Sequence, residues 1–259
     1  MTTTPSPSVL VPDDLLRLME LVRRSDSIEL KLTVPASAYR PAAKALGIDP
    51  LTAQIRQVFF FDTPDLALNR TGVVVRARRI QGRDGDSTVK LRPIEPAEVS
   101  EKVRASRQFS IEVDAMPGGY VCSGSMKSVV GPAAVLASVN GERPVHKLFS
   151  KEQRHFYDAH APEGLAMDDL SVLGPILVLK LKIPPAEFSR RLVVEMWIYP
   201  DGSRVVEVST KCLPGQGLDV AREARRFLES RGIPVGGEQQ TKTKTALEFF
   251  ASELTESSA

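Results

Sequence analysis

Pairs of like charges recur two residues apart in those segments of the sequence that alternate between polar and apolar residues. Arg76 and Arg78 lie in one such segment, and Lys90 and Arg92 lie in another. Residues at this spacing share one face of a β-strand and lie roughly 6.6 Å apart. Arginine and lysine bind phosphate oxygens through charge-assisted hydrogen bonds. The pattern therefore predicts strands that present a cationic face to a phosphate-rich anion.

Carboxylates share these polar faces. Glu29 lies two residues before Lys31 in the segment SIELKLTV, and Glu112 and Glu207 lie in later alternating segments. Carboxylate oxygens are the ligands that Mg²⁺ and Mn²⁺ prefer. If the strands close into a barrel with the charged faces inward, the lumen can hold an anion and a divalent cation together. For any single strand, a charged face turned to solvent is the plainer alternative.

The elements that must position these residues follow from the hydrophobic pattern. Alternation predicts strands at 27–34, 57–64, 73–80, 87–93 and 107–115, a hairpin at 191–211, and a continuation of the series at 151–159 and 176–183. Helical spacing predicts helices at 13–24, 35–46 and 220–231 and a last one from about residue 241, with loop and weak helix at 118–141. Eight or more antiparallel strands tend to close. We therefore expect an α+β fold, an antiparallel tunnel of eight or slightly more strands with a charged lumen and flanking helices.

Length and composition limit the class of protein. The chain has 259 residues, of which 42% are hydrophobic and 25% are charged, and these values exclude global disorder. Lys and Arg number 34 against 32 for Asp and Glu, and this balance argues against a nucleic-acid partner. The two cysteines form no CxxC pair, which excludes a zinc ribbon. We expect one domain over residues 12–252, between flexible tails at 1–11 and 253–259.

No segment of the sequence reaches the roughly 20 apolar residues that a membrane helix needs. The N-terminus, MTTTPSPSVLVPDD, lacks the cationic and apolar regions of a signal peptide. We therefore expect a cytoplasmic protein with no membrane partner.

Three segments in a fixed order carry a resemblance to a known family. SIELK, then FFFDTPDLALNRTGVVVRARR at 59–79 and TVKLR at 88–92, resemble the CYTH superfamily of triphosphate tunnel metalloenzymes. The likeness is specific over roughly residues 27–92 and weaker, though still in order, over 107–211. It implies an eight-stranded antiparallel tunnel. Members hydrolyse inorganic triphosphate, thiamine triphosphate or RNA 5′-triphosphate ends, and others cyclise ATP or handle polyphosphate.

The resemblance also implies roles for individual residues. It gives catalytic roles to Glu29, Lys31 and Lys90, and metal binding, of Mg²⁺ or Mn²⁺, to Glu29, Glu112, Asp168 and Glu207. The resemblance and the cationic strand faces together predict a set of phosphate-binding residues. These are Lys31, Arg76, Arg78, Lys90, Arg92, Arg154, Lys180, Lys182 and Lys211.

Two positions depart from the family pattern. Ser27 stands where the signature Glu-x-Glu-x-Lys has its first glutamate. The late Glu-x-Glu pair is Glu207 and Ser209 if the last hairpin strand is its equivalent, or Val178 and Lys180 if 176–182 is. Both departures remove carboxylates, so they weaken the metal site more than the phosphate site.

The leading functional hypothesis is therefore a metal-dependent hydrolase of a triphosphate or polyphosphate anion. One alternative is a polyphosphate- or nucleotide-binding protein without catalysis, which would explain a full cationic set beside missing carboxylates. Another is an adenylate cyclase of the same superfamily. The sequence leaves open whether the protein is a homodimer.

Overall fold

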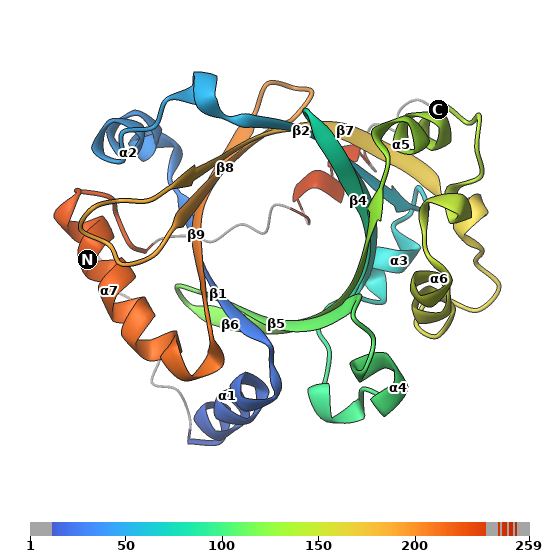
Figure 1. The fold of residues 1–259 in the computed structure, drawn as a ribbon, viewed down its shortest axis with the longest axis horizontal. Coiled ribbons are helices and arrows are strands. Elements are labelled where there is room, and N and C mark those ends of the chain that lie inside the picture. The colour runs from blue at the N-terminus through green and yellow to red at the C-terminus, as the bar shows by residue number, and fades with distance from the viewer. Residues whose placement is uncertain (1–11, 237–242, 244, 248, 251, 253–259) are drawn as a thin grey trace, which may run out of the picture.

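Nine β-strands close into a barrel in the computed structural model of this chain, which describes residues 12–236, 243, 245–247, 249–250 and 252 (Figure 1). The strands are β1 Ser27–Val34, β2 Gln54–Asp62, β3 Val73–Ile80, β4 Arg83–Leu91, β5 Phe109–Met116, β6 Gly119–Val130, β7 Ser171–Ile183, β8 Leu192–Ile198 and β9 Arg204–Cys212. Around the ring they follow the order β1, β5, β6, β4, β3, β2, β7, β8, β9. The predicted closed tunnel is confirmed. The tails predicted at 1–11 and 253–259 lie outside the described residues.

One pair of strands departs from the predicted antiparallel arrangement. β1 and β5 run parallel, with Ser27 opposite Glu112 and Glu29 opposite Asp114. All other neighbours in the ring are antiparallel. Neighbours in a closed ring can alternate in direction throughout only when their number is even. With nine strands, at least one parallel pair is unavoidable.

The sequence pattern predicted loop and weak helix at 118–141. This prediction is wrong for Gly119–Val130, which forms β6, whereas Pro132–Val139 is helical. The outward face of β6 carries small or flexible residues, among them Cys122, Gly124 and Met126. Because these are not the large β-branched or aromatic residues typical of strands, the alternation of polar and apolar residues is hard to see in the sequence. Gly124 has to be small, because a Cβ there would lie 2.6 Å from Cδ1 of Ile94 and 3.0 Å from Cζ of Phe109. The close packing of the outer layer therefore selects the residue that conceals the strand.

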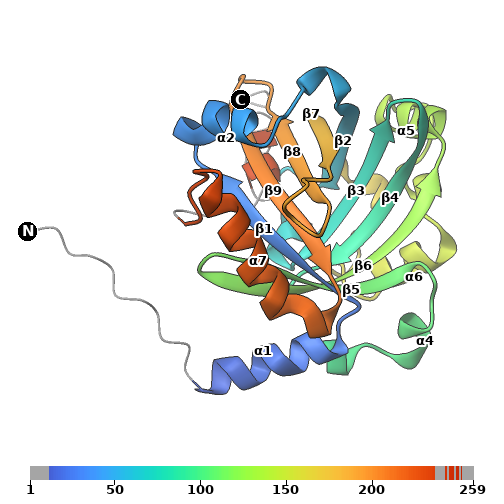
Figure 2. The ribbon, with the colours of Figure 1, turned by 60° about the vertical axis from the view of Figure 1, so that its left-hand side comes forward.

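Helices cover the outside of the barrel and bury its apolar faces. They are α1 Pro12–Arg24, α2 Tyr39–Ala45, α3 Ala67–Arg70, α4 Glu101–Arg104, α5 Pro132–Val139, α6 Lys151–Asp158 and α7 Gly217–Ser230. Short 3₁₀ turns lie at η1 Ala36–Ala38, η2 Pro50–Thr52, η3 Pro96–Glu98, η4 Val145–Leu148, η5 Met167–Asp169 and η6 Pro214–Gln216. Figure 2 shows α7 lying across the outer face of β1 and β9. Within the part of the chain that the structure describes, no helix is long and apolar enough to cross a membrane.

A second apolar cluster lies inside the barrel. Leu247 and Phe250, near the C-terminus, pack against inward-facing residues of β2, β7, β8 and β9. Phe60 and Trp197 belong to this cluster, with ring centroids 6.3 Å apart. In Figure 1 the red helical turns of this segment lie within the ring of strands. The charged lumen therefore occupies only part of the barrel interior, and the rest is an ordinary apolar core.

Candidate functional site

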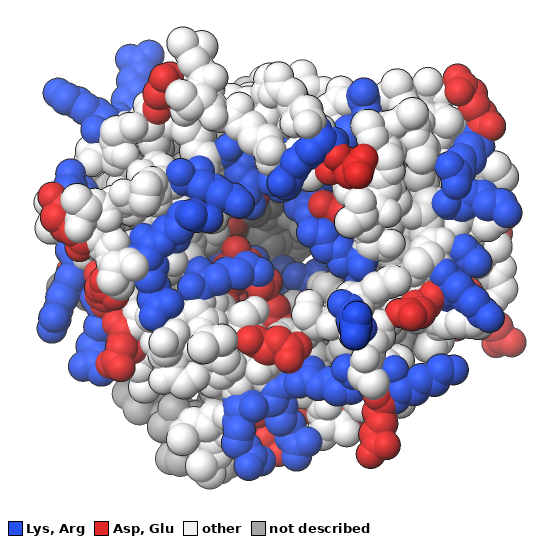
Figure 3. Space-filling view, in the orientation of Figure 1, with Lys and Arg blue, Asp and Glu red and all other residues white. Residues whose placement is uncertain are grey.

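The remaining interior of the barrel is a charged cavity of about 410 Å³. Figure 3 shows that it opens to solvent, with Lys and Arg side chains gathered around the opening. Eleven residues predicted from the sequence line it: Glu29, Lys31, Arg76, Arg78, Lys90, Arg92, Glu112, Lys180, Lys182, Glu207 and Lys211. The polar faces thus point inward, and the alternative in which they face solvent is wrong for these strands.

Five further charged residues line the same cavity and were not among the predicted site residues. They are Arg56, Arg83, Asp86, Lys127 and Glu195. Arg56 has the same strand phase as Val58 and Phe60, so extending the predicted strand by one residue at its start would have found it. Lys127 lies on β6, the strand that the pattern did not predict.

Arg154 and Asp168 lie outside this cavity, contrary to the expectation that they join the site. Arg154 belongs to the helix α6 and donates a hydrogen bond from Nη1 to the carbonyl of Phe149 at 2.6 Å. Asp168, in η5, accepts a hydrogen bond from the backbone N–H of His146, and its Oδ2 lies 2.5 Å from Nδ1 of the same residue. Both residues line a separate surface pocket.

The helix that carries Arg154 has a local cause. Ser150 accepts a hydrogen bond from the backbone N–H of Gln153, and the Gln153 side chain accepts one from the backbone N–H of Ser150. This capping box starts a helix where the sequence reading continued the strands. The Ser-x-x-Gln spacing was the available signal.

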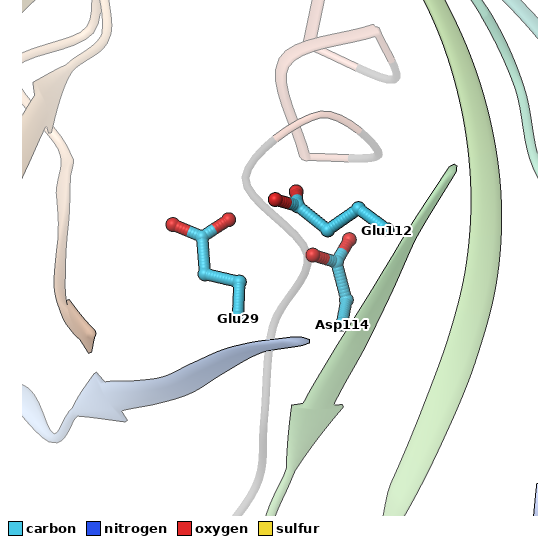
Figure 4. Close-up of side chains that lie close together, drawn as sticks. All are labelled: Glu29, Glu112 and Asp114. Carbon is cyan, nitrogen blue, oxygen red and sulfur yellow. The ribbon is translucent and has the colours of Figure 1, made fainter. Parts of the chain in front are cut away.

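Three carboxylates meet inside the cavity. Oxygens of Glu29, Glu112 and Asp114 all lie within 4.8 Å of one another (Figure 4). The parallel register brings them together, because Glu29 on β1 lies opposite Asp114 on β5 and Ser27 lies opposite Glu112. Sequence reasoning assigned a metal role to Glu29 and Glu112 but not to Asp114. Glu207 lines the same cavity but is not one of these three.

Cations surround the acid cluster formed by Glu29, Glu112 and Asp114. Lys31 Nζ lies 2.7 Å from Asp114 and 3.2 Å from Glu29. Lys90 Nζ and Arg92 Nη2 lie 3.6 Å and 3.5 Å from Asp114 Oδ2.

Lys211 contacts the other side of the cluster. Its ammonium group forms an ion pair with Glu112 and lies 4.0 Å from Glu29. The carboxylates are thus held by four positive groups in the protein itself.

These contacts shift the acidities in opposite directions. Burial favours the neutral form of Asp114, but Lys90, Lys31 and Arg92 outweigh it and lower the pKa to about 2. Burial lowers the pKa of Lys90 to about 8, although Asp114 opposes the shift. Burial and the negative charge of Glu29 raise the pKa of Glu112. Glu29 and Asp114 raise the pKa of Lys31 against the effect of its burial.

The rest of the cavity is predominantly basic, and its arginines differ in how far they are paired. Arg78 donates two hydrogen bonds to Asp86, at 2.9 and 2.8 Å. Arg76 has a buried Nε without a hydrogen-bond partner among the described residues. Burial and the neighbouring Arg78 lower the pKa of Arg76 to about 10, so it is still charged at neutral pH. Arg76 is therefore placed to bind an incoming anion with little competition from the protein.

The acid cluster fits one hard divalent cation. Its donors are carboxylate oxygens, the type that Mg²⁺ and Mn²⁺ prefer. Both oxygens of Asp114 are buried, and they form ion pairs with Lys31, Lys90 and Arg92. The Ser27 hydroxyl, at the position where the resemblance predicts a glutamate, donates a hydrogen bond to Glu112 Oε2 at 3.3 Å. Ser27 therefore orients this carboxylate but adds no carboxylate to the cluster.

Comparison with known proteins places the fold. No family model matches the sequence, and no curated protein matches it. Solved structures that match the fold include HpAC1 from Hippeastrum and a protein from Bacillus halodurans. HpAC1, named as an adenylyl cyclase with a dominant triphosphatase activity, has a TM-score of 0.64 and 16% identity over 86% of this chain and 95% of its own. The second, named as an adenylate cyclase, has a TM-score of 0.58 and 12% identity over 85% of this chain and 97% of its own. At these identities the two likenesses show the fold alone, and this fold agrees with the closed, helix-flanked barrel predicted from the sequence.

Proposed function

We propose that this protein is a metal-dependent hydrolase that cleaves a phosphoanhydride bond of a triphosphate or polyphosphate anion bound in the barrel. The observation that carries the proposal is that one cavity holds both the acid cluster of Glu29, Glu112 and Asp114 and the cationic Arg76, whose buried Nε has no hydrogen-bond partner among the described residues. Carboxylates that can hold a divalent cation and cations that can hold phosphates are the two requirements of phosphoryl transfer.

The chain's own residues divide into two tasks. Arg76, Lys90 and Arg92 would bind the oxygens of the phosphate chain and fix its position beside the acid cluster. Lys31 would keep Glu29 and Asp114 in place through its ion pairs at 3.2 and 2.7 Å. Lys90, with a pKa of about 8, can give its proton to the phosphate oxygen that leaves.

Glu29, Glu112 and Asp114 would hold the divalent cation, Mg²⁺ or Mn²⁺. When bound, such a cation polarises phosphoryl oxygens and lowers the pKa of water. Water adds to phosphorus as the bridging bond breaks, and the products are orthophosphate and a chain that is one phosphate shorter.

The second candidate is an anion-binding protein without catalysis. One specific feature favours it: every carboxylate of the acid cluster already has a cationic partner in the protein. Ser27 and Ser209 also stand where the family signature has acids. Such a protein would bind triphosphate through Arg76 without cleaving it.

The deciding experiment measures orthophosphate release from inorganic triphosphate by the purified protein, with Mg²⁺, with Mn²⁺ and with chelator. We expect metal-dependent release that Glu29→Gln lowers at least about a hundredfold. The matched control is Asp168→Asn, an acid outside the cavity, which should keep the wild-type rate.

Two further substrates complete the experiment. Long-chain polyphosphate tests whether a longer anion is preferred. ATP tests the cyclase alternative, because cyclisation yields cyclic AMP and pyrophosphate, whereas hydrolysis yields ADP and orthophosphate. Triphosphate that binds tightly, is not cleaved with any metal, and no longer binds to Arg76→Ala would establish the binding protein instead.

A further inference from the structure

Lys211 differs from the other cations that contact the acid cluster. The Lys31, Lys90 and Arg92 side chains are 18%, 21% and 23% exposed, and all three contact the fully buried Asp114. The Lys211 side chain is 58% exposed, and its contacts are with Glu112 and Glu29. Three of the cations are therefore built into the protein interior, and the fourth reaches the cluster from the solvent side.

The carboxylates of the acid cluster come from two strands, β1 and β5, and the strand register places Lys211 on a third strand, β9, that faces the cluster. On β9, Glu207, Ser209 and Lys211 share the inward face, and Lys211 lies directly opposite Glu29 on β1. Its ammonium group thus approaches two of the three carboxylates that could hold a divalent cation. Lys211 places one positive charge beside the carboxylate oxygens of Glu112 and Glu29. A divalent metal ion bound there would place two positive charges beside the same oxygens.

We infer that Lys211 is an exchangeable counter-ion of the acid cluster, which a divalent cation must displace from Glu112 and Glu29 in order to bind. The inference concerns the metal side of the proposed function and rests on it for its biological meaning. Lys211 and the divalent cation bind the same carboxylate oxygens alternately, because both positive charges cannot share them at close range. In the metal-free protein, Lys211 keeps Glu29 and Glu112 from repelling each other.

The displaced side chain stays useful. Lysine is a flexible point charge with a four-carbon stem, and Lys211 lines the cavity that the anion would enter. Once released from Glu112, its ammonium group can bind phosphate. Metal binding and anion binding therefore support each other: a metal ion frees a phosphate ligand, and a phosphate chain draws Lys211 away from the metal ligands.

The test is a direct measurement of Mn²⁺ binding to the full-length chain without any phosphate, by calorimetry and by electron paramagnetic resonance of free Mn²⁺. We expect Lys211→Met to bind Mn²⁺ about tenfold more tightly than the wild type, or better, because the competing charge is gone. Lys211→Arg keeps the charge and should stay within about threefold of the wild type.

Two controls confine the effect to this site. Lys182→Met removes a cation that lines the same cavity but forms no ion pair with the acid cluster in the described part of the chain. It should leave Mn²⁺ affinity unchanged within about threefold. Adding Glu112→Gln to Lys211→Met should abolish the gain. Thermal melting of each variant verifies that it is folded.

The outcomes separate this inference from the proposed function. Equal or weaker Mn²⁺ binding by Lys211→Met, an equal gain in Lys182→Met, or no detectable Mn²⁺ binding by any variant overturns the exchange. Phosphate release by the wild type without a gain in Lys211→Met leaves the hydrolase standing and removes the exchange. A gain in Lys211→Met without phosphate release by the wild type supports the exchange and removes the hydrolase.

Discussion

Arg78 on β3 and Asp86 on β4 lie directly opposite each other and form a two-pronged ion pair inside the cavity, with N···O distances of 2.9 and 2.8 Å. Asp86 also lies 3.5 Å from Lys127. A substrate phosphate must therefore compete with a carboxylate of the protein for Arg78. By contrast, Nε of Arg76, on the same face of β3, has no hydrogen-bond partner among the described residues.

We therefore predict that Asp86→Asn binds triphosphate more tightly than the wild type. Asp86 is only 5% exposed, so the change removes a buried negative charge. It thereby releases Arg78 and Lys127 to bind the anion. At this depth the gain should be about three- to tenfold in affinity, measured by calorimetry without metal. Ser125→Ala alters the same cavity without altering its charge, and it should leave the affinity unchanged. Weaker binding by Asp86→Asn would show that Asp86 positions Arg78 and does not compete for it.

A comparison of Arg76 with Arg154 distinguishes anion binding inside the cavity from anion binding on the outer surface, because Arg76 lines the cavity and Arg154 does not. Arg76→Ala should weaken triphosphate binding at least about tenfold, because it removes a charged hydrogen-bond donor from the cavity. Arg154→Ala should change the affinity less than about twofold, because Arg154 lies in α6 and donates to the carbonyl of Phe149. Calorimetry with inorganic triphosphate measures both. Similar losses in the two variants would mean that the anion binds outside the barrel.

Lys90 should give anion binding a pH dependence near pH 8. Burial lowers its pKa to about 8 in the anion-free protein, so Lys90 is charged below that pH and loses its charge above it. The affinity for triphosphate should therefore fall as the pH rises from 7 to 9. Lys90→Arg stays charged throughout.

The ratio of wild-type to Lys90→Arg affinity isolates this group, because the ionisation of triphosphate itself affects both proteins equally. We expect the ratio to fall about tenfold for each pH unit well above 8. It should level off above the pKa that Lys90 has in the complex, which the bound anion raises. A ratio that stays constant from pH 7 to 9 would contradict the lowered pKa.

Asp114 should stabilise the fold above about pH 4. Its ordinary pKa of 3.8 is lowered to about 2 in the folded protein, so the folded state favours the ionised form. The resulting stability is complete above the pKa of the unfolded chain and is lost as the pH falls from about 4 towards 2. Urea unfolding of the wild type should show this loss, and unfolding of Asp114→Asn should show a smaller one.

At neutral pH, Asp114→Asn should lower the free energy of unfolding by about 3 kcal/mol. The reason is that Lys31, Lys90 and Arg92 would keep their charges in the interior without the carboxylate that they share. Glu229→Gln is a suitable control, since this exposed acid pairs with Arg225 on the surface of α7. An Asp114→Asn protein as stable as the wild type would show that the remaining acids can neutralise the three cations.

The barrel could be predicted from the sequence because period-two alternation reports directly on which face of a strand is apolar. SIELKLTV shows this clearly: Glu29 and Lys31 face the cavity, whereas Ile28 and Leu32 are buried under the outer layer. The same reasoning failed for β6, whose outer face carries small residues. It also failed at Arg154, where a capping box ended the strand pattern.

The acid cluster was only partly predictable, and the reason is topological. Asp114 lies on the same strand face as Glu112, so its inward direction follows from the alternation. Its position beside Glu29 depends on β1 and β5 being neighbours, and they are 85 residues apart in the sequence (Ser27 opposite Glu112). Local patterns carry no information on that pairing. In the same way, the apolar residues Leu247 and Phe250 predict a buried helix, but not that it is buried inside the barrel.

The position of β1 in the ring, between β5 and β9, has a consequence for the time course of folding. β1 closes the ring between β5 and β9, and its partner Lys211 follows Glu29 by 182 residues. At a synthesis rate of roughly 5–20 residues per second, β1 therefore leaves the ribosome roughly 10–40 s before β9 does. During that interval β1 exposes an unpaired edge, which is a hazard for aggregation. Since the acid cluster spans the seam between β1 and β5, its three carboxylates meet only when the nascent chain draws that seam together.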